Sequence, residues 1–188
     1  MQHSEPKKHL TIQSDLINSC VCGDRRAQRK LFEALSPKMF SLCLRYMGNR
    51  ELAEDVLQDG FVTLFTKLSD YGGTGSFEGW ARKIFITTAL MALRKNDVLK
   101  ISDDIDTAWE VSSQEAGPVR QIGYKELLLL IAELPPGYRI VFNMFAVEGY
   151  THKEIAQILG VTEATSRSRF HRARKMLQEK IKEMDDAG

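Results

Sequence analysis

Residues 167–174 read RSRFHRAR, and the four arginines of this segment are candidate functional groups. Guanidinium groups bind phosphates and the acceptor edge of guanine, so the segment is a candidate nucleic-acid contact. Phe170 and Ala173 interrupt the arginines. At about 100° per residue, the apolar side of a helix would carry Ser166, Phe170, Ala173, Leu177 and Ile181. The spacing therefore predicts an amphipathic helix with a positive outer surface.

The outer surface of this predicted helix holds the candidate DNA contacts. Arg167 and Arg169 are expected to flank it and to reach phosphates, while Ser168, His171 and Arg172 face a major groove. Arg174 lies nearer the buried edge, where an intramolecular ion pair is an equal alternative. The full candidate set is Thr165, Arg167, Ser168, Arg169, His171, Arg172, Arg174 and Lys175.

A lone basic helix is usually a solvated surface, but the residues before it favour DNA binding. Thr151 and Glu154 form a T-x-x-E capping box at a helix start. Gly160 is suited to end that helix in the left-handed conformation, and Thr162 can cap the next one. Two capped helices joined at a glycine, the second with a polar outer face, are typical of a helix-turn-helix. An ordinary helical hairpin is the alternative.

Charge is distributed unevenly along the chain, although the net charge is only +1. Residues 162–182 contain seven Lys/Arg and two Glu, whereas residues 97–115 contain six acidic residues and one lysine. This asymmetry indicates one surface that binds a polyanion and one segment that avoids or imitates polyanions.

The elements that position these groups are predicted to be helices, and no segment alternates as a strand does. Expected helices cover residues 25–35, 37–47, 50–68, 77–95, 123–133 and 136–148. Pro37 is predicted to break or kink the chain between the first two. Residues 69–76, with three glycines, form a loop before a helix expected to carry Phe77, Trp80, Ile84, Thr88 and Met91 on one face.

The fold class is therefore all-α, with two small helical domains joined by an acidic linker. The expected boundaries are 1–97 for the first domain, 98–120 for the linker and 121–188 for the second domain. No apolar run is long enough for a membrane span, the N-terminus lacks a signal-peptide core, and three cysteines suit a reducing compartment. We therefore expect a cytoplasmic protein with no membrane insertion, metal or cofactor.

With these motifs in place, the chain resembles the extracytoplasmic-function (ECF) sigma factors of bacterial RNA polymerase over residues 24–180. In the second half of the chain the resemblance rests on LPPGYRIVFNMFAVEGYTHKEIAQILGVTEATSRSRFHRARKML. In the first half it rests on NRELAEDVLQDGFVTLFTKL followed by SFEGWARKIF. The resemblance implies a dissociable specificity subunit that binds core RNA polymerase and promoter DNA. It also implies an anti-sigma factor as a partner, and a linker that stands in for RNA in the transcript's exit path. A plain spacer is the alternative for that linker.

The resemblance also assigns the first domain's candidate residues. Those expected to bind core polymerase are Asp55, Gln58, Asp59, Phe61 and Phe65, with core packing as an alternative for the two phenylalanines. Those expected to read and melt the downstream promoter box are Tyr71, Phe77, Trp80, Arg82 and Lys83. Packing is an equal alternative for Trp80.

The chain departs from the family in the reading helix, where TSRSRF stands in place of TVKSRL. Ser166 thus replaces a buried valine, and the helix is expected to seat less firmly. The main alternative function is a stand-alone helix-turn-helix regulator, which would need a dimer interface in residues 1–97. An enzyme is disfavoured, because the sequence has no P-loop and no clustered carboxylates, histidines or cysteines.

Overall fold

The computed structural model describes residues 14–95 and 123–186, with the side chains of residues 124 and 125 left out. No strand occurs within these ranges, and the all-α prediction is confirmed. A 3-10 turn (Leu68–Asp70) follows the third helix, and a π-helical segment (Asn143–Val147) follows the sixth. The α-helices are α1 (Ser14–Val21), α2 (Arg25–Met47), α3 (Arg50–Thr66), α4 (Phe77–Lys95), α5 (Tyr124–Ala132), α6 (Pro136–Phe142), α7 (His152–Leu159) and α8 (Glu163–Asp186).

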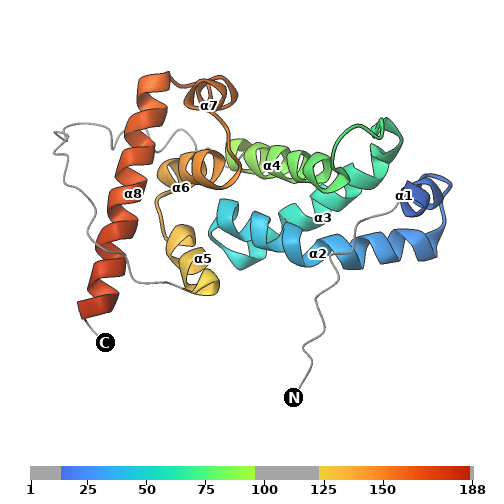
Figure 1. The fold of residues 1–188 in the computed structure, drawn as a ribbon, viewed down its shortest axis with the longest axis horizontal. Coiled ribbons are helices and arrows are strands. Elements are labelled where there is room, and N and C mark those ends of the chain that lie inside the picture. Colours follow the sequence, from blue (N-terminus) through green and yellow to red (C-terminus); the bar gives the residue numbers. More distant parts are fainter. Residues whose placement is uncertain (1–13, 96–122, 187–188) are drawn as a thin grey trace, which may run out of the picture.

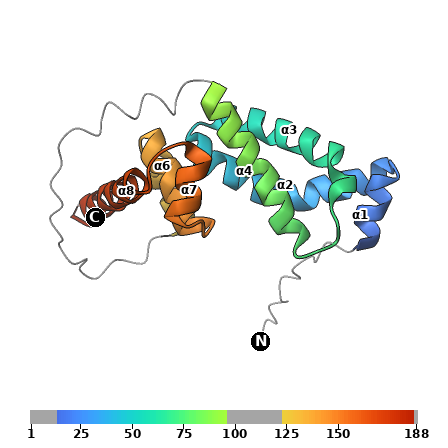
Figure 2. The ribbon, with the colours of Figure 1, turned by 90° about the horizontal axis from the view of Figure 1, so that it is seen from above.

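The helices form two bundles that lie side by side (Figures 1 and 2). Helices α1–α4 make the first bundle and α5–α8 the second, with α6 between the long α8 and the first bundle. The acidic linker expected at 98–120 lies outside the described residues. The helices expected to position both candidate DNA elements are thus present, one in each bundle.

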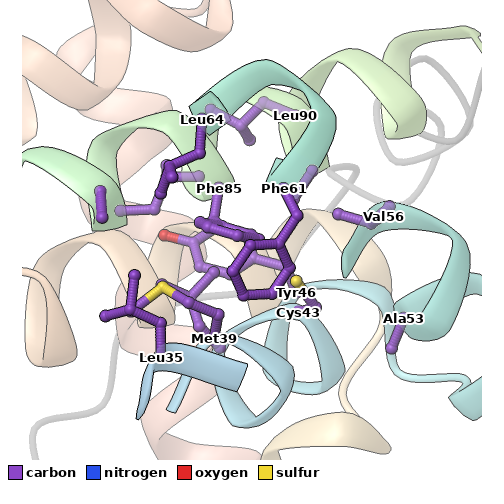
Figure 3. Packing of buried hydrophobic residues seen from close by; sticks show 14 of the residues in the cluster. Leu35, Met39, Cys43, Tyr46, Ala53, Val56, Phe61, Leu64, Phe85 and Leu90 are labelled. Carbon is purple, nitrogen blue, oxygen red and sulfur yellow. The ribbon is translucent and has the colours of Figure 1, made fainter. Parts of the chain in front are cut away.

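The core of the first bundle forms where α2, α3 and α4 meet (Figure 3). Side chains three or four positions apart on α2 point into it, because that spacing places them on one helix face. Phe61 of α3 and Phe85 of α4 meet edge to face at 5.1 Å between ring centroids. Burial in this core raises the pKa of the Cys43 thiol to about 12. The labelled core side chains are Leu35, Met39, Cys43, Tyr46, Ala53, Val56, Phe61, Leu64, Phe85 and Leu90.

Helix α2 runs without interruption through Pro37, so the predicted break is wrong. Proline removes one backbone donor from a helix, yet here Leu35 and Met39 on either side of it are 1% and 0% exposed. Their burial on one continuous face holds the helix together, since tertiary packing outweighs a local preference. Asp24 caps the start of the helix, where its carboxylate accepts from two backbone amides, and Gly48 caps the end with a φ of 67°.

The face of α4 turned toward the core differs from the prediction. Ala81, Phe85 and Ala89 are fully buried, whereas Met91 is 61% exposed. Helix α4 carries apolar residues on most of its circumference, so periodicity alone did not distinguish its two apolar faces. Of the predicted stripe, Phe77 is buried as expected, whereas Trp80, Ile84, Thr88 and Met91 line an open groove between α3 and α4.

The hydrophobic core continues from the first bundle into the second. Ile140, Val141, Met144 and Ile155 join the cluster built by α2, α3 and α4. A smaller cluster, which contains Tyr138, Ala173 and Leu177, seats α8 on α5 and α6. The two bundles are therefore packed against one another in this structure.

Candidate nucleic-acid interface and docking groove

The helix-turn-helix predicted for residues 150–170 is present. The Glu154 backbone amide donates to Thr151 Oγ1 at 3.2 Å, and the Thr151 amide donates to Glu154 Oε2 at 2.8 Å. The Thr151 amide also lowers the pKa of the Glu154 carboxyl. Gly160 ends α7 with a φ of 72°, and Thr162 caps α8 by accepting from the Thr165 amide at 3.0 Å. These local bonds fix the angle at which α8 leaves the turn.

Ser166 seats α8 on α7 through a polar contact. Its side chain is fully buried, and its Oγ lies 3.0 Å from His152 Nδ1. The His152 ring stacks on Phe145, with centroids 4.2 Å apart, and Phe145 contacts Phe170 at 4.5 Å. Burial, and next the charge of Arg167, lower the pKa of His152. A hydrogen-bonded hydroxyl beside a stack of rings therefore joins α8 to α7.

The outer face of α8 differs from the prediction at two arginines. Arg167, Ser168 and His171 are exposed as expected, but Arg169 is only 2% exposed and Arg174 is exposed. The buried face is centred near Ala173, about 40° from Arg169 and about 100° from Arg174 around the helix. The flank position expected for Arg169 is therefore wrong, as is the buried edge expected for Arg174.

The other candidate contacts on α8 already have partners within the chain. Arg172 donates to the Tyr138 hydroxyl at 3.3 Å, and Arg167 pairs with Glu163 one turn earlier. Lys175 lies 3.9 Å from a Glu179 carboxylate oxygen, and the Thr165 hydroxyl lies 2.8 Å from that of Thr162. The Arg167–Glu163 pair is exposed and contributes little, so a phosphate can replace Glu163 there at small cost.

The loop before α4 is organised around three aromatic rings. Tyr71 lies 5.0 Å from Phe77 and 5.4 Å from Trp80, and Phe77 lies 5.6 Å from Trp80. The Tyr71 hydroxyl donates to the Gly75 carbonyl at 2.9 Å and so closes the loop. Phe77 is buried, while Tyr71 and Trp80 are partly exposed. The cluster holds the loop and leaves the Tyr71 and Trp80 rings partly exposed.

A groove of about 770 Å³ runs between α3 and α4; we refer to it as the α3–α4 groove. Exposed apolar side chains line it, including Val62 at 68% and Met91 at 61% exposed. Asp55 and Asp59 line it from α3, and Lys83 lines it from α4. An exposed apolar surface bordered by charges is typical of a docking site for another macromolecule.

The candidate polymerase contacts divide by exposure. Asp55, Gln58 and Asp59 are exposed on α3. Phe61 is 4% exposed and packs on Phe32 and Phe85, so the packing interpretation applies to it. Phe65 is partly exposed and lies next to the same cluster.

Arg82 and Lys83 have different surroundings, although they are neighbours in sequence. Lys83 is exposed and lines the α3–α4 groove. Arg82 is 30% exposed at its side chain and donates to Glu148, which belongs to the second bundle. The structure therefore separates two residues that the sequence placed in one set.

Sequence reasoning missed the polar contacts that join the bundles. Arg139 of α6 donates to the Tyr46 and Met47 carbonyls at 3.0 and 2.9 Å, and to carbonyls at the end of α5. Desolvation lowers the pKa of this buried arginine. Asn143 donates to the Arg45 carbonyl at 3.0 Å. Arg139 and Asn143 lie more than ninety positions from their partners on α2, so no local pattern signals these contacts.

Two negative findings apply to the described residues alone. No group of three or more His, Cys, Asp or Glu there is placed to hold a metal ion. No helix there has both the length and the apolar composition needed to cross a bilayer.

Comparison with known proteins supplies two family matches in one chain. Residues 31–98 match the model for Sigma-70 region 2, and residues 124–177 match that for Sigma-70, region 4. The chain is 29% identical over 165 residues to the ECF RNA polymerase sigma factor SigE of Mycolicibacterium smegmatis, with 84% of this chain and 63% of that protein covered. It is 27% identical over 177 residues to the ECF RNA polymerase sigma-E factor of Salmonella typhimurium, with 88% and 92% covered.

Among solved structures, the chain is similar to the sigma factor RpoE of Bartonella quintana, solved in complex with the anti-sigma factor NepR. The identity is 18% and the TM-score 0.49, with 80% of this chain and 94% of that chain covered.

Proposed function

This chain belongs to the ECF sigma factors of the sigma-70 family, and from that premise we propose that it binds core RNA polymerase and directs it to a specific promoter. The observation that carries the proposal is the order of the two matches, region 2 on the first bundle and region 4 on the second. A helix-turn-helix alone occurs in many regulators, whereas both regions in one chain are specific to sigma factors.

We propose that α8 reads the upstream promoter box. Its exposed Arg167, Ser168, His171 and Arg174 form a positive outer face, and the capped turn at Gly160 presents that face away from the bundle. Arg172 and Lys175 are partly exposed beside them. Arg169 is buried, so its part is to seat α8. Arginine and histidine donors suit guanine edges and phosphates.

We propose that α4 and its preceding loop bind the downstream box. Tyr71 and Trp80 offer partly exposed ring surface for stacking a base, and Phe77 supports both from beneath. Lys83 supplies an exposed positive charge and lines the same groove as Trp80. Flipped bases need this combination of ring faces and cations.

Core polymerase is proposed to dock on the α3 face of the first bundle. Asp55, Gln58 and Asp59 are exposed on consecutive turns, and Asp55 and Asp59 border the apolar α3–α4 groove. Apolar surface with polar groups at its rim fits a protein partner. Phe65 is the aromatic side chain of the set that retains exposure, while Phe61 supports it from the core.

The remaining expectations follow from membership of this family. The chain is proposed to act as a cytoplasmic initiation factor without catalytic activity, with domain limits of 1–97 and 121–188 and an anti-sigma factor as a further partner. A stand-alone regulator is the second candidate, which the helix-turn-helix by itself favours.

The proposal is tested by adding the protein to purified core polymerase and transcribing a genomic library in vitro. Transcripts that start at a shared two-box sequence, and only when the protein is present, support it. Transcription without any common start sequence contradicts it.

A further inference from the structure

One buried carboxylate, that of Glu148, joins the two bundles through its partners Arg45 and Arg82. We propose that these three residues form an autoinhibitory latch, which must open before Arg82 is available to promoter DNA. The inference rests on the proposed function, because it takes α4 and α8 to be the DNA-reading elements.

The latch is a charged triad with little access to water. Arg45 Nη2 of α2 lies 3.0 Å from Glu148 Oε1, and Arg82 Nη2 of α4 lies 2.6 Å from Glu148 Oε2. The Glu148 side chain is 4% exposed and that of Arg45 is 6% exposed. A buried carboxylate is tolerated only while its partners remain in place, so Glu148 holds the second bundle against both helices.

Glu148 occupies Arg82 in the way that a DNA phosphate would. Arg82 donates through Nε and Nη2 to the same carboxylate oxygen, at 3.2 and 2.6 Å. A guanidinium uses the same fork of donors for a phosphate. Because these donors are engaged by Glu148 in the closed structure, Arg82 contacts promoter DNA only after the latch opens.

Further polar contacts reinforce the closed arrangement and make opening feasible. Asn143 and Arg139 donate to the carbonyls of Arg45, Tyr46 and Met47, which lie at the last turn of α2. The carbonyls of a helix end lack partners within the helix, so water can replace these donors when the bundles separate. Apolar contacts from α6 also contribute, so removing Glu148 is expected to loosen the interface in part.

The helix-turn-helix is held against α4 at a second point. Arg94, in the last turn of α4, donates to the Ile158 carbonyl in the last turn of α7. The proposed upstream reader and the proposed downstream reader are therefore attached to each other. Two separated promoter boxes require them to move apart, so the closed form represents the resting state and the open form the DNA-binding state.

The test measures the distance between the bundles in the full-length chain. Exposed Thr66 of α3 and Glu179 of α8 are changed to cysteine for spin labels, with exposed Cys22 changed to serine. Glu148→Gln removes the latch charge and keeps the side-chain size. Glu33→Gln is the matched control, because Glu33 is exposed and pairs with Arg29 within α2.

We expect one short distance in wild type and Glu33→Gln, and an added longer population in Glu148→Gln. Affinity for a short random-sequence single-stranded DNA should rise about tenfold in Glu148→Gln relative to Glu33→Gln. The salt slope of single-stranded DNA binding by Glu148→Gln should increase by about 0.7, since one more phosphate contact forms. A Glu148→Gln protein that keeps the wild-type distance, or a tenfold gain shared by Glu33→Gln, overturns the latch.

Arg45→Ala provides the second test, and it also covers the case in which Glu148→Gln fails to fold. This variant lowers the positive charge of the chain, so simple electrostatics predicts weaker DNA binding. The latch predicts the opposite, longer distances and tighter binding, because Glu148 loses its most buried partner. If Arg45→Ala binds DNA more weakly and keeps the wild-type distance between the labels, the proposal is overturned.

The failure of the latch and the failure of the proposed function give different results. Core polymerase added to wild type should move the labels from the short to the long distance. If polymerase binds while the short distance persists, the latch is wrong. If Glu148→Gln opens but neither protein binds polymerase, the latch stands and the sigma-factor proposal fails.

Discussion

Gly60 is a buried glycine in the middle of α3, and replacing it by alanine sets two opposite effects against each other. Alanine favours a helix interior over glycine by about 0.5–1 kcal/mol. At Gly60, however, an added Cβ would lie 2.3 Å from both Cδ1 and Cε1 of Phe85. Carbon atoms pack best at about 3.5–4.0 Å, so the ring would have to move by more than 1 Å.

Phe85 has no free space into which to move, because it is 0% exposed and its ring already meets Phe61. Overpacking of a dense core costs about 1–3 kcal/mol, which exceeds the helix preference of alanine. We therefore expect Gly60→Ala to lower the free energy of unfolding by about 1–2 kcal/mol. Urea titration followed by circular dichroism measures this as a lower midpoint with an unchanged slope.

Gly79 on α4 provides the matched control. A Cβ there would lie 3.7 Å from the Ser76 Cβ, which is an ordinary contact. Gly79→Ala should therefore leave the free energy of unfolding unchanged or raise it by up to about 1 kcal/mol. In a Phe85→Leu background, the loss caused by Gly60→Ala should shrink, since the two sites are coupled. A Gly60→Ala protein as stable as wild type would refute the packing argument.

Three further predictions concern the candidate surfaces and the turn. Arg172→Ala should lower the free energy of binding to the selected promoter by about 1–3 kcal/mol and relax the sequence preference. Arg167→Ala should instead weaken binding to all DNA sequences alike and lower the salt slope of binding by about 0.9. Equal losses on specific and random DNA for both variants would show that Arg172 meets no base. The double variant Gln58→Ala with Asp59→Ala should weaken binding to core polymerase by about 2 kcal/mol, as measured by titration. Thermal melts should show that its stability changes by less than about 0.5 kcal/mol per site. Normal polymerase binding would remove both residues from the docking face. Thr151→Ala should destabilise the second bundle by about 0.5–2 kcal/mol in urea titration, because it removes the capping box, and an unchanged midpoint would show that the cap is dispensable.

The sequence predicted the parts of the fold whose causes are local. Thr151, Glu154 and Gly160 fix the helix-turn-helix through bonds that span three or four positions, and such signals can be read from the order of residues alone. Gln58 and Asp59 lie off the apolar stripe of α3, and both are exposed as that spacing indicates. These local signals established the all-α class and most helix limits.

Other features depend on packing that no short window contains. Periodicity placed Arg169 on the flank of α8, but the helix turns its Ala173 side toward the bundle and so buries Arg169. Glu148 gives no sequence signal of burial, since its partners lie on α2 and α4. Helix α2 continues through Pro37 because Leu35 and Met39 are buried on both sides of it.

The central claim is tested most directly by titrating purified core RNA polymerase into the fluorescently labelled full-length protein. A sigma factor forms a saturable complex with one copy bound per polymerase, and Gln58→Ala with Asp59→Ala weakens it. A chain that shows no affinity for polymerase, yet binds a palindromic operator tightly as a dimer, would contradict the claim.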